Sequence, residues 1–281
     1  MIVYPNAKIN IGLFVTGKRP DGFHDLETFF YPIGLSDMLE IVTAEGKKGE
    51  CRFSQTGLEV ECDVEDNLVV KAYRLLDADY HLPALSVHLH KVIPFGAGLG
   101  GGSADAAFML KAVDAYFNLG IGTAGLEAYA ARLGSDCAFF VRNRPAFAHG
   151  KGELLEEAAL SLAAYRLVVV KPGFGVSTAD AYRGIVPCAA GFDLRHLGGL
   201  PVEEWKGRVG NDFERTVFAK YPVLAALKQQ LYAGGAVFAS MTGSGSAVYG
   251  LFRREDAVKA DFPGCFVWQD GVNDERLMMN D

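Results

Sequence analysis

The sequence lacks any hydrophobic run long enough to cross a membrane. No apolar stretch among its 281 residues approaches the roughly eighteen residues that a transmembrane helix needs. The first residues, Met1 to Lys8, also lack the basic region and following apolar block of a secretory signal peptide. We therefore expect neither a membrane partner nor secretion.

Cysteine is scarce, and no C-x-x-C pair is present. The five cysteines, at positions 51, 62, 137, 188 and 265, are odd in number and scattered. This pattern predicts free thiols in a reducing cytoplasm rather than disulfides or a zinc site. His88 and His90 alternate on one predicted strand, but no third ligand follows nearby. We interpret them as ordinary strand-face histidines, with no metal site.

Positive charge is also in short supply. There are 27 lysines and arginines against 34 acidic residues, which gives a formal net charge of -7. Non-specific nucleic-acid binding needs a basic surface, so nucleic acid is not an expected partner. A nucleotide ligand stays compatible with this charge, because a few local lysines and backbone amides suffice to hold it.

Half of the residues are hydrophobic, no internal repeat is visible, and the length suits two domains. We place the boundary near residue 155, between a domain of residues 1–155 and an α+β domain of residues 156–281. Hydrophobic periodicity predicts strands at 7–15, 23–33, 38–43, 86–91, 167–170, 237–241, 247–252 and 265–269. It predicts helices at 67–80, 103–116, 123–133, 211–220, 221–232 and 254–262, and a short one carrying Tyr182.

The most distinctive stretch is Pro94 to Ala107, where five glycines fall within seven positions between a predicted strand and a predicted helix. Glycine allows positive φ and leaves bare N–H groups, and a helix start attracts anions, so the order predicts a phosphate cradle. Ser103 is a candidate N-cap. No Gly-Lys-Ser/Thr follows, which excludes a P-loop, and the dinucleotide fingerprint fits only loosely. The alternative is a turn that merely lets helix and strand pack closely.

Three polar residues elsewhere could carry chemistry. Lys8 and Asn10 share one face of the first predicted strand, where a solvated face is the alternative. Asp136 stands among small and apolar residues. It is either a helix N-cap, which the local sequence favours, or a partly buried carboxylate with a chemical task.

Three segments together resemble the GHMP small-molecule kinase superfamily: Pro5 to Asn10, Pro94 to Ala107, and Met241 to Ala247. Within it, the sequence is most similar to members whose acceptor is a cytidine-diphosphate-linked polyol. The residues that carry this likeness are Ala7–Asn10, Arg19–His24, Asp66–Leu68, Gly100–Ser103, Leu133–Asp136 and Gly210–Glu214.

The resemblance implies an α+β fold with a ribosomal-protein-S5-like ATP-binding domain, a ferredoxin-like second domain and an active site in the cleft. It implies Lys8 and Asp136 as the catalytic pair, which reverses the local preference for a cap at Asp136. ATP, with Mg²⁺, would contact Lys91, Pro94, Gly96, Gly98, Leu99, Gly100, Gly101, Gly102, Ser103 and Asp105. The substrate would contact Asn10, Phe23, His24, Phe30, Thr178 and Tyr182, with Phe23, His24 and Tyr182 around the cytosine. Thr242 to Ser246 would lie behind the substrate.

Two positions depart from the family pattern. The family often has asparagine where Asp105 stands, so this chain places a negative charge one helical turn from the phosphates unless Asp105 serves Mg²⁺. It often has tyrosine where Phe23 stands, so stacking is kept and a hydroxyl is lost. Two rival functions stay open at this stage: a homoserine, mevalonate or sugar kinase of the same superfamily, and a catalytically silent nucleotide-binding module. We expect a monomer or a weak homodimer.

Overall fold

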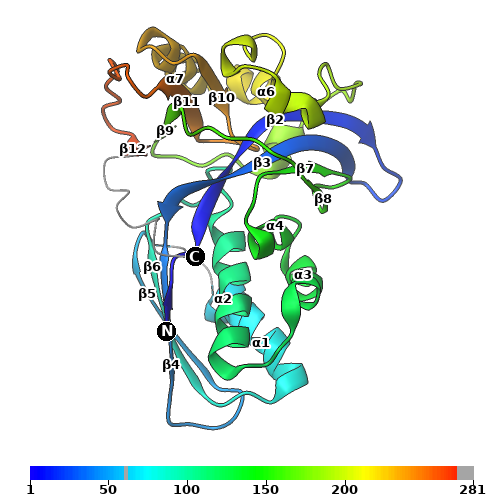
Figure 1. Cartoon of the computed structure of the whole chain (residues 1–281), viewed down its shortest axis with the longest axis vertical. Helices are drawn as coiled ribbons and strands as arrows, with labels where there is room; N and C mark the ends of the chain where they lie inside the picture. Colours follow the sequence, from blue (N-terminus) through cyan, green and yellow to red (C-terminus); the bar gives the residue numbers. More distant parts are fainter. Residues whose placement is uncertain (60–62, 271–281) are drawn as a thin grey trace. The chain divides into compact units, whose positions relative to one another are not determined.

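The computed structural model describes residues 1–59 and 63–270, and its contacts divide the chain into two compact units (Figure 1). Unit 1 holds residues 1–7, 35–95 and 100–144. Unit 2 holds residues 8–34, 96–99 and the chain from 145 onward. The units are interleaved along the sequence, whereas the boundary near residue 155 cuts the chain once. That boundary stays a prediction about the family's two domains.

Unit 1 is a four-stranded sheet with helices on one side (Figure 1). Its strands lie in the order β1 (Ile2–Val3), β4 (Met38–Thr43), β6 (Leu85–Lys91) and β5 (Cys51–Gly57). The β5–β6 pair is parallel and the other pairs are antiparallel. The helices are α1 (Leu68–Tyr80), α2 (Gly101–Phe117), α3 (Gly122–Leu133) and α4 (Cys137–Arg142), with a 3-10 turn at Val64–Asp66.

Local sequence explains these elements. In β6, Leu85, Val87 and Leu89 are buried, because alternate side chains of a strand face the same side. Helix α1 begins where predicted, since the Asn67 side chain accepts a hydrogen bond from the Val69 N–H. His88 and His90 bond to Ser54 and Thr56 of the neighbouring strand, as befits strand-face histidines.

Unit 2 contains two further four-stranded sheets. One has the order β2 (Asn6–Lys18), β3 (His24–Ser36), β7 (Ala146–His149) and β8 (Leu154–Glu157). The other is antiparallel, in the order β10 (Phe238–Met241), β11 (Val248–Arg253), β9 (Tyr165–Lys171) and β12 (Phe266–Gln269). Helices α5 (Thr178–Tyr182), α6 (Phe213–Lys220) and α7 (Pro222–Ala233) complete the unit, with 3-10 turns at Leu194–Gly199 and Val202–Glu204.

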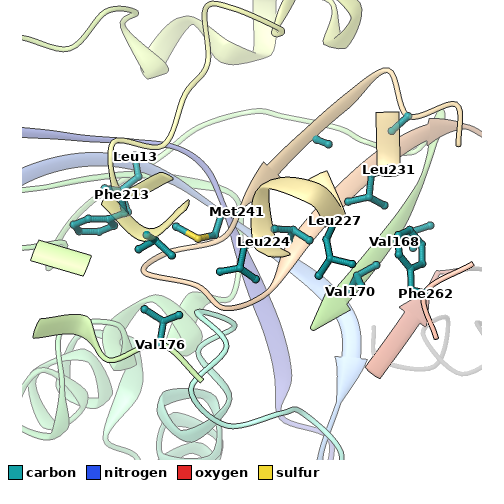
Figure 2. Close-up of a cluster of buried hydrophobic side chains, with 14 of the residues drawn as sticks. Leu13, Val168, Val170, Val176, Phe213, Leu224, Leu227, Leu231, Met241 and Phe262 are labelled. Carbon is teal, nitrogen blue, oxygen red and sulfur yellow. The ribbon is translucent and has the colours of Figure 1, made fainter. Parts of the chain in front are cut away.

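The core of unit 2 joins distant parts of the sequence (Figure 2). Leu13 from β2 belongs to the same buried cluster as Val168 and Val170 from β9, and Leu224 from α7. Removing such side chains from water is the main favourable contribution to folding. The cluster therefore ties the amino-terminal strand to the carboxy-terminal half of the chain.

Two expected features are wrong. Helix α2 begins at Gly101 and its N-cap is Gly100, with φ 73°, so Ser103 lies inside the first turn and is no cap. Residues 254–262 form no helix. Val258 and Ala260 are half-buried and Phe262 is buried, while the residues between them are exposed. That alternation, with the Lys259 N–H bonded to the Gly234 carbonyl, fits an extended segment held by tertiary contacts.

Candidate active site

Lys8 lies on β2 with its side chain buried, at 3% exposure. Its ammonium donates to the Asn10 side-chain oxygen at 2.6 Å and to the Gly98 carbonyl at 3.1 Å. The same ammonium lies 5.0 Å from the centre of the Phe30 ring. A charge removed from water needs such partners, so β2 and the glycine loop together fix where the ammonium points.

Asn10 is held in turn by two threonines. Its side-chain amide donates to the Thr28 hydroxyl at 2.9 Å, and its backbone N–H donates to the Thr242 hydroxyl at 3.0 Å. Thr242 also donates to the Gly98 carbonyl at 3.0 Å. Asn10, Thr28 and Thr242 are all buried. The first predicted strand and the Thr242–Ser246 segment therefore meet at Asn10, the residue that accepts the hydrogen bond of Lys8.

The glycine loop has the backbone of an anion cradle. Gly96, Gly98 and Gly100 have φ of 63°, 73° and 73°, which only glycine adopts readily. A Cβ at Gly98 would stand 2.1 Å from the Thr242 carbonyl oxygen, so a side chain has no room there. Within the described residues, no amide from Gly98 to Ser103 donates to a backbone carbonyl. These groups, which the start of α2 completes, are free for an anionic ligand.

Lys91 does not present a free ammonium beside this loop. It is buried, and it donates to Asp37 at 2.5 Å and to Asp105 at 2.7 Å. Burial alone would lower the pKa of Lys91, but the two carboxylates outweigh it and raise that pKa. Contact of Lys91 with the adenine stays a prediction. Through Asp105, the lysine fastens the end of β6 to the second turn of α2.

Asp136 immediately precedes α4 and is half-buried. It stands at the N-cap position, yet its side chain makes no capping hydrogen bond. The neighbouring Cys137 is buried, which raises the pKa of its thiol to about 11, and a hydrogen bond with Ser103 partly opposes this. Capping therefore leaves the Asp136 carboxylate unexplained. Its pairing with Lys8, from the other compact unit, stays a prediction.

Of the expected substrate contacts, the aromatic group assembles in part. His24 and Tyr182 stack with ring centres 4.7 Å apart and planes 22° apart, and Phe213 meets Tyr182 edge-on. Phe23 is 60% exposed, with the Lys151 ammonium 4.9 Å from its ring centre. Phe30 is buried next to Lys8 instead, and Thr178 is exposed at the start of α5. The exposed ring of Phe23 suits stacking on a flat base.

Two contributing residues were not singled out from the sequence. Thr28 supports Asn10, and Asp37 binds Lys91 while also accepting the Val92 and Ile93 N–H groups. A weak signal exists for each: Thr28 lies two residues before Phe30 on the same face of β3, and Asp37 is a lone acid between two strands.

A resident metal is not supported by the described residues, in which no three histidine, cysteine or acidic side chains come together in a way that could hold an ion. Asp105 in particular is buried against Lys91. Over the same residues, no helix is long and apolar enough to span a membrane.

Comparison with known proteins gives the class first. Family models of the GHMP kinases match twice: the N-terminal domain model at residues 67–144 and the C-terminal model at residues 202–262. A crystal structure of a homoserine kinase from Cytophaga hutchinsonii has the same fold, with a TM-score of 0.66 at 17% identity over 94% of this chain and 93% of that one. The expected two-domain GHMP kinase fold is therefore confirmed.

The particular family follows from closer relatives. The chain is 52% identical to 4-diphosphocytidyl-2-C-methyl-D-erythritol kinase of Bacteroides fragilis over 270 residues, which cover 96% of this chain and 98% of that protein. A crystal structure of 4-(cytidine 5'-diphospho)-2C-methyl-D-erythritol kinase matches with a TM-score of 0.73 and 33% identity, covering 89% and 90% of the two chains. This chain belongs to the 4-diphosphocytidyl-2-C-methyl-D-erythritol kinase family.

Proposed function

We propose that this protein transfers the γ-phosphoryl group of ATP to the 2-hydroxyl of 4-diphosphocytidyl-2-C-methyl-D-erythritol, a step of the non-mevalonate route to isoprenoid precursors. One observation supports this most strongly. The Lys8 ammonium is hydrogen-bonded to the carbonyl of Gly98, within a loop whose following amides are free for phosphate. A phosphoryl-transfer site needs that combination of a fixed cation and an anion cradle.

The loop and the first turn of α2 bind the triphosphate in this proposal. Pro94, Gly96, Gly98, Leu99, Gly100, Gly101, Gly102 and Ser103 supply the contacts. Lys8 neutralises charge that develops on the transferred phosphoryl oxygens, and Asn10 with Thr28 keeps it in place. Positioning and charge neutralisation account for most catalysis of phosphoryl transfer. Mg²⁺ enters as the partner of ATP, held mainly by its phosphates.

Asp136 receives the proton of the acceptor hydroxyl, or orients that hydroxyl, in the same proposal. A carboxylate of ordinary basicity is a weak base for an alcohol, so proton transfer comes late, when the oxygen is already bonding to phosphorus. Phe23, His24 and Tyr182 hold the cytosine, and Phe30 and Thr178 border the substrate. We further propose that the protein acts in the cytoplasm as a monomer or weak homodimer.

The test is a coupled assay of ADP release with several acceptors. Turnover is expected with 4-diphosphocytidyl-2-C-methyl-D-erythritol and not with homoserine, mevalonate or galactose, and cytidine diphosphate should compete with the acceptor. A K8M variant serves as the background control. Faster turnover with one of the other alcohols would assign a different kinase activity. If no acceptor tested gave ADP release, the protein would be a nucleotide-binding module without kinase activity.

A further inference from the structure

We propose that Asp105 is a positioning residue that carries a proton: its carboxyl is protonated within a buried cluster of Asp37, Lys91 and Asp105, and triphosphate binding at the first turn of α2 takes up a proton there. The inference rests on the proposed function only in taking ATP as the ligand.

The cluster contains two carboxyl groups but only one ammonium group. Two carboxylates share one ammonium, at 2.5 Å and 2.7 Å, and the side chains of all three residues are at most 4% exposed. If both acids were ionised, the cluster would bury a net negative charge, which is costly inside a protein. A single added proton makes the buried cluster neutral.

The hydrogen bonds indicate which acid holds the proton. Asp37 has both oxygens occupied, one by Lys91 and the other by the N–H groups of Val92 and Ile93. Asp105 accepts from Lys91 with one oxygen, while the other is buried and has no hydrogen-bond partner among the described residues. Asp37 therefore accepts three hydrogen bonds and Asp105 accepts one, so Asp105 is the acid with an oxygen left to carry the proton.

Electrostatics points the same way. Burial raises the pKa of Asp105 to about 8, with Lys91 opposing the rise and Asp37 adding to it. The charges that act most strongly on Asp105 are those of Lys91 and Asp37. The elements packed around the cluster carry further titratable groups: Lys71, Tyr73, Arg74, Asp77, Asp79 and Tyr80 on α1, Glu40 on β4, Cys51 and Arg52 on β5, His88 and His90 on β6, Glu127, Tyr129 and Arg132 on α3, Asp136, Cys137 and Arg142 at α4, and Lys111, Asp114 and Tyr116 on α2 itself. Of these, Lys71 pairs with Asp66, Arg74 with Glu65 and Arg142 with Glu127.

The cluster lies directly under the predicted phosphate site. A Cβ at Gly101, the first residue of α2, would stand 3.2 Å from the Lys91 ammonium nitrogen, and Asp105 is one turn further along the helix. Triphosphate at this helix start adds negative charge close to Asp105. That charge opposes ionisation of the carboxyl, so the bound state holds the proton more tightly. The proton comes from the buffer, and no bond other than O–H forms.

The first experiment measures proton uptake when a non-hydrolysable ATP analogue binds, by calorimetry in buffers of different ionisation enthalpy. Near pH 8 about half of the Asp105 carboxyls are ionised before binding, so uptake approaches about 0.5 proton per site at most. The analogue itself contributes little, because phosphate second ionisations lie near pH 6. Between about pH 7.5 and pH 9.5 the dissociation constant should rise several-fold.

Two variants identify the group. D105N keeps the shape and cannot titrate, so its binding should show no uptake and a flat dissociation constant over this pH range. D114N removes an acid from the same helix and should keep the uptake. An infrared carboxylic-acid band in the wild-type protein, lost as pH rises through about 8 and retained to higher pH with the analogue, gives the answer without any variant.

Binding of the analogue without proton uptake, or uptake that persists in D105N, would overturn the inference and leave the kinase assignment intact. Failure of the wild-type protein to bind the analogue would overturn both. An infrared band that is absent at pH 7 would overturn the inference even if D105N did not fold.

Discussion

At the scale of single residues, the site depends on buried polar side chains that hold one another. Asn10 is the clearest case, because its side chain connects the Lys8 ammonium to the Thr28 hydroxyl. The Thr28 hydroxyl in turn donates to the Gly12 carbonyl at 2.6 Å. A buried network of this kind is stabilising only while every member is paired.

Replacing Thr28 by valine should therefore reduce kcat. The substitution keeps the shape but removes the group that receives the Asn10 amide and donates to Gly12. We expect kcat to fall about 10-fold through misplacement of Lys8, with KM for ATP nearly unchanged, and unfolding to become easier by about 1–3 kcal/mol. T28S, which keeps the hydroxyl, should restore kcat. Wild-type kcat in T28V would show that Thr28 does not support Lys8.

Asp136 calls for a separate test, because a cap and a catalytic carboxylate predict different kinetics. D136N should lower kcat by about 10²-fold or more while ATP still binds with near wild-type affinity. The matched control is D63N, which removes another acid that immediately precedes a helical turn and makes no capping hydrogen bond. Turnover close to wild type in D136N would remove Asp136 from the chemistry.

At the scale of elements, the turn after β9 braces the glycine loop. The Lys171 ammonium donates to the Pro172 carbonyl at 2.9 Å and to the Phe174 carbonyl at 3.1 Å. The Phe174 carbonyl also accepts from Ser246, whose own N–H bonds to the Gly96 carbonyl. One lysine thus holds a turn that contacts the first glycine of the loop.

K171M should consequently weaken ATP binding more than it slows chemistry. With the turn released, we expect KM for ATP to rise about 3- to 10-fold, while kcat at saturating ATP changes less than twofold. K171Q keeps an N–H donor for one carbonyl and should recover part of the affinity. Equal loss of kcat and kcat/KM would mean that the turn acts on the transition state instead.

Elements were easier to predict from the sequence than the site was. Strong local signals, such as the Asn67 cap and the alternation in β6, lie within a few residues and are confirmed. The helix expected at 254–262 failed because tertiary hydrogen bonds and alternate burial overrode helix-forming composition. The glycine loop was recognisable in the sequence, because its positive φ values require glycine at those positions. Thr28 and Asp37 were not, because their roles depend on partners far away in the chain.

At the scale of the whole molecule, the two compact units do not correspond to two halves of the chain. Strand β2 is tied to the second half by the N–H of Val15, which donates to Asp212 at 2.7 Å, and by Tyr249, which donates to the Asn10 carbonyl at 3.0 Å. Leu13 lies in the same core cluster as α6 and α7 (Figure 2).

A cut at residue 155 should accordingly produce fragments that do not fold alone. Residues 156–281 would lose the packing of Leu13 and Val15, and residues 1–155 would leave those side chains exposed. We expect neither fragment to unfold cooperatively, whereas the two expressed together should recover ATP turnover. Cooperative unfolding of 156–281 by itself, followed through Trp205 and Trp268 fluorescence, would instead support independent domains at that boundary.

The stability of the whole chain should also carry the signature of Asp105. Its pKa is raised from 3.8 to about 8 in the folded protein, mainly by burial. Between these values the folded state binds more protons than the unfolded state. The contribution of this carboxyl to the free energy of unfolding is therefore full below about pH 4 and is lost as pH rises to about 8. Asparagine has no such dependence.

D105N should therefore gain stability relative to the wild-type protein as pH rises from about 5 to about 8, by up to about 1 kcal/mol per pH unit, and the difference should level off above that. Other groups titrate in both proteins and cancel in the difference. Urea unfolding followed by far-UV circular dichroism measures this difference in the free energy of unfolding.

Tryptophan fluorescence provides a control. Both tryptophans lie in unit 2 and Asp105 lies in unit 1, so the fluorescence transition should shift less with pH if the units unfold separately. If the difference in free energy of unfolding between the two proteins stayed constant from about pH 5 to about pH 8, Asp105 would be ionised throughout this range. The buried cluster would then carry a net negative charge.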